Sequence, residues 1–127
     1  MPRNEDRKSD NIKFEIEFYE KILEDRPNFT DALKVLAELY TKSGMHKKGL
    51  ELDKKLAGLL PCDSLVYYNL ACSYSLLGDI DNSLKSIKKS IELGYSDFAY
   101  INKDPDLANV RQDKRFENII SRNIDKK

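Results

Sequence analysis

Three side chains in this sequence could support thiol or imidazole chemistry: Cys62, Cys72 and His46. The two cysteines are ten residues apart, a separation that fits no zinc-binding pattern. His46 is the single histidine, and no partner stands near it at the spacing of a catalytic dyad or a metal site. We therefore expect both cysteines to be small buried hydrophobic residues and His46 to be a surface or half-buried turn residue. We expect no catalytic residues, no metal and no cofactor.

The composition limits the class of partner. The chain has 127 residues, enough for one domain, and its 22 Lys and Arg balance its 22 Asp and Glu. It lacks the basic excess that drives phosphate binding. No run of 18 apolar residues occurs, and the start, MPRNEDRKSDN, has no apolar signal core. These features favour a cytoplasmic protein that binds neither nucleic acid nor membrane. Few Gly and Pro, with abundant Leu, Ile, Lys, Glu and Asp, predict an all-α fold.

An internal repeat organises the elements that position Cys62, Cys72 and His46. Residues 30–63 align with residues 64–97 at a shift of 34, and nine positions are identical. The identical pairs are Leu36/Leu70, Ala37/Ala71, Tyr40/Tyr74, Gly44/Gly78, Leu50/Leu84, Lys54/Lys88, Lys55/Lys89, Leu59/Leu93 and Asp63/Asp97. The same frame aligns residues 11–29 with the second half of a repeat.

Each repeat is predicted to be a pair of helices. Apolar residues recur at helical spacing on both sides of a glycine, Gly44 in the first repeat and Gly78 in the second. Small residues stand where paired helices must approach closely, among them Gly49 and Ser83 on the second helices. Pro61 ends the first repeat, and Asp63 or Ser64 is expected to cap the next helix.

The repeated motif L-A-x-x-Y, the turn glycines, Pro61 and the period of 34 residues resemble the tetratricopeptide (TPR) repeat. The resemblance covers two full repeats, 30–63 and 64–97, and the half-repeat 11–29. It implies a short right-handed α-solenoid of helix-turn-helix units. Departures from the family pattern include Leu33 and Tyr67 where a Trp is usual, and Asp53 where an aromatic residue is usual.

The two ends are expected to differ from the repeats. Residues 1–10 are polar and charged, and we expect a disordered leader. Residues 11–29 lack a first helix, and Glu15 takes the position of Gly49 and Ser83, where a long side chain would keep a first helix away. The helix is nevertheless apolar over a wide arc. Either the N-terminal residues or the rest of the domain fold over it, or Phe14 and Phe18 join two copies in a homodimer.

Residues 98–124 are predicted to form a helical capping tail. Asp104 can cap a short helix with Pro105 at its first position, and Asp113 can cap another that carries Phe116. The run resembles the tail of many bacterial TPR arrays, the end-of-group module, which implies that it covers the apolar face of the last repeat. The matching residues are Gly94, Tyr95, Phe98, Asp104, Pro105, Asp106, Leu107, Arg111, Asp113 and Phe116. Arg111 is interpreted as an ion-pair hub among aspartates.

The TPR resemblance also implies a binding site. The first helices of such arrays line a concave groove that binds peptide segments or helices. Carried over to this sequence, the groove residues are Lys34, Val35, Glu38, Thr41, Leu65, Tyr68, Asn69, Cys72, Ser75 and Leu76. Asn69 takes the place of an Asn that bonds a peptide backbone in many TPR repeats, and Tyr68 offers an aromatic platform. In the alternative interpretation, Leu65, Tyr68 and Leu76 pack against the capping tail and leave nothing exposed.

These features predict a non-catalytic scaffold that binds a peptide or helical segment of a partner protein in the groove. The alternative function is a self-assembling structural protein that dimerises through its N-terminal apolar helix. Nothing in the spacing of the polar residues supports an enzyme.

Overall fold

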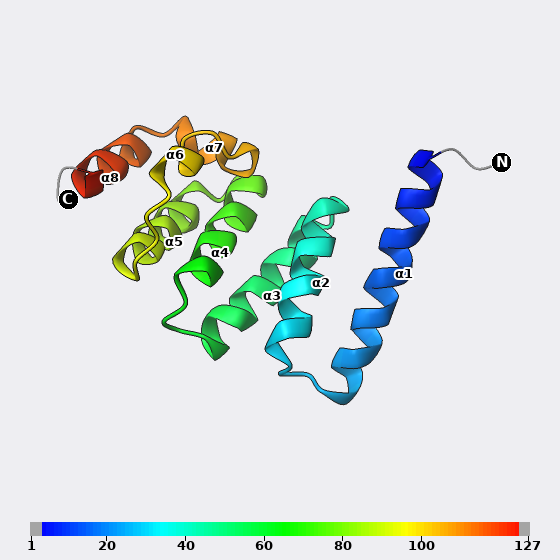
Figure 1. Cartoon of the computed structure of the whole chain (residues 1–127). Helices are drawn as coiled ribbons and strands as arrows, with labels where there is room; N and C mark the ends of the chain where they lie inside the picture. Colours follow the sequence, from blue (N-terminus) through cyan, green and yellow to red (C-terminus); the bar gives the residue numbers. More distant parts are fainter. Residues whose placement is uncertain (1–3, 125–127) are drawn as a thin grey trace. The chain divides into compact units, whose positions relative to one another are not determined.

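The helices of the chain form two separate compact units. The computed structural model describes the backbone of residues 4–124 and the side chains of residues 8–123. Its elements are α1 (Asn4–Asp25), α2 (Thr30–Lys42), α3 (His46–Leu59), α4 (Ser64–Leu76), α5 (Ile80–Glu92), α6 (Phe98–Ile101), the short 3-10 helix η1 (Pro105–Leu107), α7 (Ala108–Arg111) and α8 (Lys114–Ile124) (Figure 1). The described residues contain no strand, and the all-α prediction is confirmed. The units divide between Leu59 and Leu60, and each is described by itself.

The first unit is built on the hairpin of α2 and α3 (Figure 1). Gly44 turns the chain between them with a φ of 78°, a conformation that costs a residue with a Cβ more than it costs glycine. Leu33 and Leu36 are buried on α2, as is Leu56 on α3. Burial of this apolar stripe stabilises the hairpin, because side chains three and four residues apart share one helix face.

Helix α1 packs on α2 and is longer than expected. The Tyr40 hydroxyl on α2 donates a hydrogen bond of 2.5 Å to Glu20 Oε2 on α1. Helical backbone begins at Asn4, seven residues before the expected start at Asn11, so residues 4–10 differ from the predicted disordered leader. The run NEDRKSD contains neither Gly nor Pro, and its Glu5, Arg7 and Lys8 are good helix formers, which allows the helix to extend. Residues 1–3 lie outside the described residues.

The second unit is built on the hairpin of α4 and α5. Asp63 caps α4, its side chain accepting hydrogen bonds from the amides of Leu65 and Val66. Gly78 turns the chain with a φ of 79°. Two serines of α5 fasten the helices together: Ser83 Oγ donates to Ala71 O at 2.8 Å, and Ser90 Oγ donates to Ser64 O at 2.7 Å.

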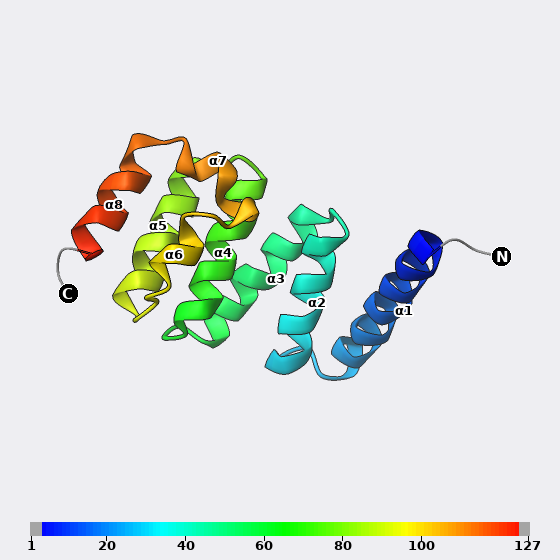
Figure 2. The same ribbon diagram turned by 45° about the horizontal axis from the view of Figure 1, so that its top comes forward.

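The tail, residues 98–124, folds onto this second hairpin (Figure 2). Asp104 caps η1 with Pro105 at its first position, as the sequence predicted, and the Asp113 side chain accepts a hydrogen bond from the Arg115 amide at the start of α8. One buried cluster joins the hairpin to the tail. Its members are Tyr68, Ala71, Cys72, Leu84, Ile87, Ile101, Leu107, Val110, Phe116 and Ile120.

The two cysteines and His46 differ in how far they are exposed. Cys72 is buried as expected, whereas Cys62 is exposed, because it lies in the loop after Pro61 and before α4. His46 is half-buried at the first residue of α3, as expected. Within the part of the chain that the structure describes, no helix is long and apolar enough to cross a membrane.

Candidate protein-interaction surfaces

The chain's own tail covers three of the six predicted groove residues on α4. Tyr68, Cys72 and Ser75 are buried, with 4%, 6% and 0% of their surfaces exposed. Ser75 Oγ accepts a hydrogen bond from the Val110 amide at 3.2 Å, and Ser75 O accepts one from Asn109 Nδ2 at 2.9 Å. The prediction that these three α4 residues face a partner is therefore wrong for the chain in this state. The alternative, packing of Tyr68 against the tail, is what the structure has.

Asp104 is the polar centre of this contact. Its side chain is buried, with Oδ2 accepting a hydrogen bond of 2.5 Å from the Tyr68 hydroxyl and one of 3.8 Å from Cys72 Sγ. Its Oδ1 accepts from the Asp106 amide at 3.0 Å. Burial, the hydrogen bond to Asp104 and nearby charge raise the pKa of Tyr68 far above its usual range, so the phenol stays a donor at neutral pH. A buried donor and a buried acceptor thus satisfy each other.

Aromatic packing adds to the cover over Tyr68. The ring of Tyr95 stacks on Tyr68 with centroids 4.4 Å apart and planes within 6°. Tyr100 lies against the same ring at 6.4 Å. Stacked and tilted aromatic pairs stabilise the packing by more than the burial of their surface alone. The tail therefore holds Tyr68 as a core residue of the second unit.

The remaining groove residues of α4 are more accessible. Leu65 is 57% exposed, Asn69 is exposed and Leu76 is half-buried. The expectation that Leu65 packs against the tail is thus wrong, because Leu65 lies in the first turn of α4, beyond the cluster that Tyr68 and Cys72 form.

The corresponding face of α2 is open within its own unit. Lys34, Val35 and Glu38 are exposed, and Thr41 is half-buried. Glu38 forms an ion pair of 3.1 Å with Lys42, one turn further along the helix. The Thr41 hydroxyl donates to the Ala37 carbonyl of its own helix at 3.0 Å. This surface, called here the α2 face, offers one apolar side chain between charges of both signs.

A second exposed apolar surface lies on α1. Phe14 is 70% exposed and Phe18 is 51% exposed, one helical turn apart. These two side chains, called here the Phe ridge, are more exposed than the half-buried Ile12, Ile16 and Tyr19 of the same helix. The sequence-based alternative that the rest of the domain folds over α1 is therefore wrong for these two residues.

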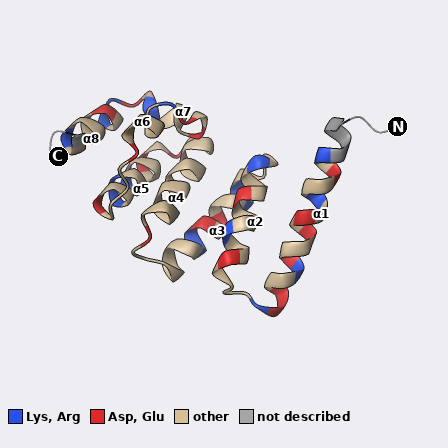
Figure 3. Cartoon of the chain, in the orientation of Figure 1, with Lys and Arg blue, Asp and Glu red and all other residues tan. Residues whose placement is uncertain are grey.

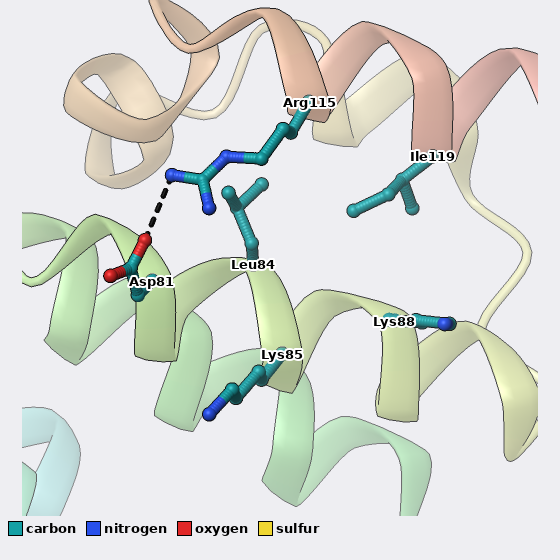
Figure 4. Close-up of a pocket in the computed structure, with 6 residues that line it drawn as sticks. All are labelled: Asp81, Leu84, Lys85, Lys88, Arg115 and Ile119. Atoms are coloured by element: carbon teal, nitrogen blue, oxygen red, sulfur yellow. Dashed lines mark hydrogen bonds and ion pairs between the residues drawn. The ribbon is translucent and has the colours of Figure 1, made fainter.

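Sequence reasoning missed a hollow between α5 and α8. It has a volume of about 280 Å³, and its lining residues are Asp81, Leu84, Lys85, Lys88, Arg115 and Ile119. Leu84 and Ile119 point into the space between the helices, while Arg115 reaches across to Asp81 (Figure 4). The sequence carries no signal for the α5/α8 hollow, because it depends on how α8 docks on α5.

Arg115 joins α8 to α5 at one end of this hollow. Its Nη2 donates to Asp81 Oδ1 at 2.8 Å and to Asp113 Oδ2 at 3.0 Å. The hydrogen bonds and charge of Arg115 lower the pKa of Asp113 to about 2. Because Arg115 is exposed and Asp113 is partly exposed, water and salt screen the pair strongly.

The predicted role of Arg111 needs correction. Its Nη1 donates to the carbonyls of Ile101 and Asp104, at 3.0 and 2.6 Å, and not to carboxylates as the ion-pair interpretation required. The guanidinium satisfies carbonyls at the ends of α6 and of the following turn, where helical hydrogen bonds stop. Arg111 thus orders the tail.

Comparison with known proteins bears on the fold. No family model matches the chain, so the resemblance of the tail to the end-of-group module stays a prediction. Among curated proteins, the chain is 32% identical over 84 residues to a chloroplastic protein of Arabidopsis thaliana. That match covers 64% of this chain and 25% of the relative, so the chain spans about a quarter of the relative's length.

Solved structures of MamA are similar over nearly the whole chain. The structure of MamA from residue 41 to its end, from Desulfovibrio magneticus RS-1, matches with a TM-score of 0.68 at 16% identity, covering 90% of this chain and 67% of that one. A MamA RS-1 double mutant matches with a TM-score of 0.67 at 17% identity, covering 92% and 70%. The likeness shows an all-α fold of the TPR type, as the sequence predicted.

Proposed function

We propose that this chain is a non-catalytic protein-interaction module that binds a segment of a partner protein on the α2 face. The observation that carries the proposal is the different fate of two equivalent helices. On α4, the first-helix face is occupied by short helical segments of the chain's own tail, held through Tyr68, Cys72 and Ser75. A face of this kind therefore suits a helical segment. On α2, Lys34, Val35 and Glu38 at the corresponding face are exposed.

The chemistry of the α2 face defines the kind of segment. Val35 supplies an apolar contact, while Lys34 and Glu38 place opposite charges on either side of it. A segment with one apolar anchor and flanking charges of both signs would complement this face, with the charges serving register more than affinity. Within the second unit, Leu65 and Asn69 are exposed and form a separate candidate contact surface.

The test compares the proteins retained by three forms of the 127-residue chain. The wild type, the variant Val35→Glu/Glu38→Lys and the control Lys47→Glu/Gly58→Ala are used as bait in the native host, with quantitative mass spectrometry. We expect partners to be lost from the α2-face variant and kept by the control, whose changes lie at exposed positions of α3. Equal retention of every partner by all three forms would remove the α2 face from the account.

A second candidate function is self-association through α1. The Phe ridge favours it, because two neighbouring aromatic side chains more than half exposed are costly to leave in water. Sedimentation velocity tests it: the wild-type chain should gain mass with concentration, and Phe14→Glu/Phe18→Glu should not. A wild-type chain that stays monomeric up to millimolar concentration would contradict this function.

A further inference from the structure

We propose that the Phe ridge of one chain docks in the α5/α8 hollow of a second copy of the chain, joining copies head to tail. The inference rests on the second candidate function and adds to it the surface that receives the ridge. Three observations carry it: the direction of the ridge, the chemistry of the hollow, and the opposite charge of the helices that bear them.

The Phe ridge points away from its own unit. Glu20 marks the side of α1 that meets α2, since it accepts the hydrogen bond from Tyr40. Phe18 lies two residues earlier, about 200° around the helix at about 100° per residue. Phe14 lies one turn before Phe18 on the same stripe. Docking of another surface on this side of α1 would therefore leave the contact with α2 intact.

The α5/α8 hollow suits an aromatic side chain. Leu84 and Ile119 make its apolar floor, from opposite helices (Figure 4). Its volume of about 280 Å³ exceeds the ~150 Å³ of an apolar cavity that holds benzene. One phenyl ring of the ridge can lie between the two helices, with the second ring at the edge.

The charges of the two surfaces are complementary. Residues 8–25 of α1 carry six Asp or Glu and three Lys, a net charge of −3, and Glu15 and Glu17 lie between the two phenylalanines in the sequence. Acidic residues recur along α1 in Figure 3. Residues 80–92 and 114–123, which form α5 and the described side chains of α8, carry six Lys or Arg and three Asp or Glu, a net charge of +3. The sum of charges over the whole chain is zero, so the attraction arises from separation of charge within the chain.

Two lysines at the hollow are available for this contact. Lys85 and Lys88 are exposed, and no ion pair among the described residues engages either of them. Arg115, by contrast, is already held by Asp81 and Asp113. Lys85 and Lys88 can thus meet Glu15 and Glu17 of a second copy, at a polar rim around the apolar contact.

The use of two different surfaces fixes the type of assembly. After pairing, one copy keeps its ridge unoccupied and the other keeps its hollow unoccupied, so the contact is heterologous and builds open chains or rings. A two-fold dimer of ridge on ridge would instead bring Glu15 and Glu17 of both copies together, and like charges oppose such a contact.

The experiment measures mass by sedimentation velocity with three variants of the 127-residue chain. The ridge variant is Phe14→Glu/Phe18→Glu, the hollow variant is Lys85→Glu/Lys88→Glu, and the control is Lys47→Glu/Lys103→Glu, which changes the same charge at exposed sites elsewhere. The wild type and the control should form species larger than dimers as concentration rises, and added salt should reduce them. Each of the other two variants alone should be monomeric, with self-association weakened at least about tenfold.

Mixing the ridge and hollow variants in equal amounts is the decisive step. The intact hollow of the first should accept the intact ridge of the second, giving a species with the mass of two chains and no more. A mixture that stays monomeric overturns the inference, even if each variant alone behaves as expected. A hollow variant that still self-associates also overturns it while leaving self-association through α1 in place. A monomeric wild type overturns both. Circular dichroism of each variant verifies that helicity is kept.

Discussion

The two first-helix faces occupy equivalent positions in the 34-residue frame, yet they have opposite fates. Lys34, Glu38 and Thr41 of α2 correspond to Tyr68, Cys72 and Ser75 of α4. On α4 these residues contact Asp104 and Val110 of the tail and are buried. On α2 the two charged residues, Lys34 and Glu38, are exposed. The repeat frame therefore places equivalent residues on the two faces, and on α4 these residues contact the tail that follows α5 in the same unit.

The close contact inside each hairpin shows the same division. In the first hairpin the Thr41 hydroxyl takes the Ala37 carbonyl, and a Cβ added at Gly49 would lie 2.8 Å from Thr41 Oγ1. In the second hairpin the hydroxyl of Ser75 accepts from the tail instead, and Ser83 takes the equivalent carbonyl, that of Ala71. A residue with a Cβ is crowded at this position of the first hairpin, because the Thr41 hydroxyl fills the space that serine uses in the second.

The largest expected effect follows removal of Asp104. In Asp104→Ala the buried Tyr68 hydroxyl loses its acceptor and η1 loses its cap, and we expect the second unit to lose about 3 kcal/mol of stability. Hydrogen exchange of the α4 and α5 amides measures this unit by itself.

The control for Asp104→Ala is Glu38→Ala, at the exposed position that matches Cys72. It should change stability by less than about 0.5 kcal/mol. If Asp104→Ala were equally mild, the tail would not be a structural part of the second unit.

A smaller effect is expected at Gly49. Gly49→Ala should destabilise the first hairpin by about 1 kcal/mol, since crowding against Thr41 exceeds the gain in helix propensity. Combination with Thr41→Ala should relieve the crowding, giving a coupling of at least about 1 kcal/mol in a double-mutant cycle from urea unfolding.

Gly58→Ala is the matched control for this cycle, because a Cβ at Gly58 meets nothing within 4 Å. It should raise stability by up to about 1 kcal/mol. Additive effects of Gly49→Ala and Thr41→Ala would mean that Thr41 does not set the choice of glycine.

The smallest effect concerns Asp113 in the tail, a part that the first unit lacks. Its pKa in the folded chain is lowered to about 2, below the usual value of about 3.9, so its contribution to stability is present above about pH 4 and is lost as pH falls toward 2. In Arg115→Gln the pKa of Asp113 should return toward its usual value. Carboxyl titration by NMR measures both values, and an Asp113 that titrates near pH 4 in the wild type would contradict the contact.

Local and periodic features of the fold are predictable from the sequence. The glycines of the two turns are 34 residues apart and have nearly the same positive φ, and the helices on both sides of them follow the apolar spacing. The caps at Asp63 and Asp104 are likewise predictable, because a cap depends on residues two or three positions away.

The parts that the sequence does not predict depend on contacts distant along the chain. Tyr68 and Asp104 are 36 residues apart, and the periodicity of α4 alone allows Tyr68 to face either a partner or the tail. Asp104 looks like a cap in the sequence, and its second role as acceptor for Tyr68 and Cys72 arises only when the tail folds back. The α5/α8 hollow likewise exists only once α8 has docked.

Thiol labelling of equivalent positions tests most directly whether the α4 face is closed and the α2 face is open. One measurement gives the labelling rate of Cys72 in the variant Cys62→Ser. The other gives the labelling rate of the thiol introduced by Glu38→Cys, in a chain that also carries Cys62→Ser and Cys72→Ser. Cys72 should react at least ~100-fold more slowly, since its reaction waits for the tail to open, and Asp104→Ala should accelerate Cys72 alone. Equal rates at the two positions would contradict the account.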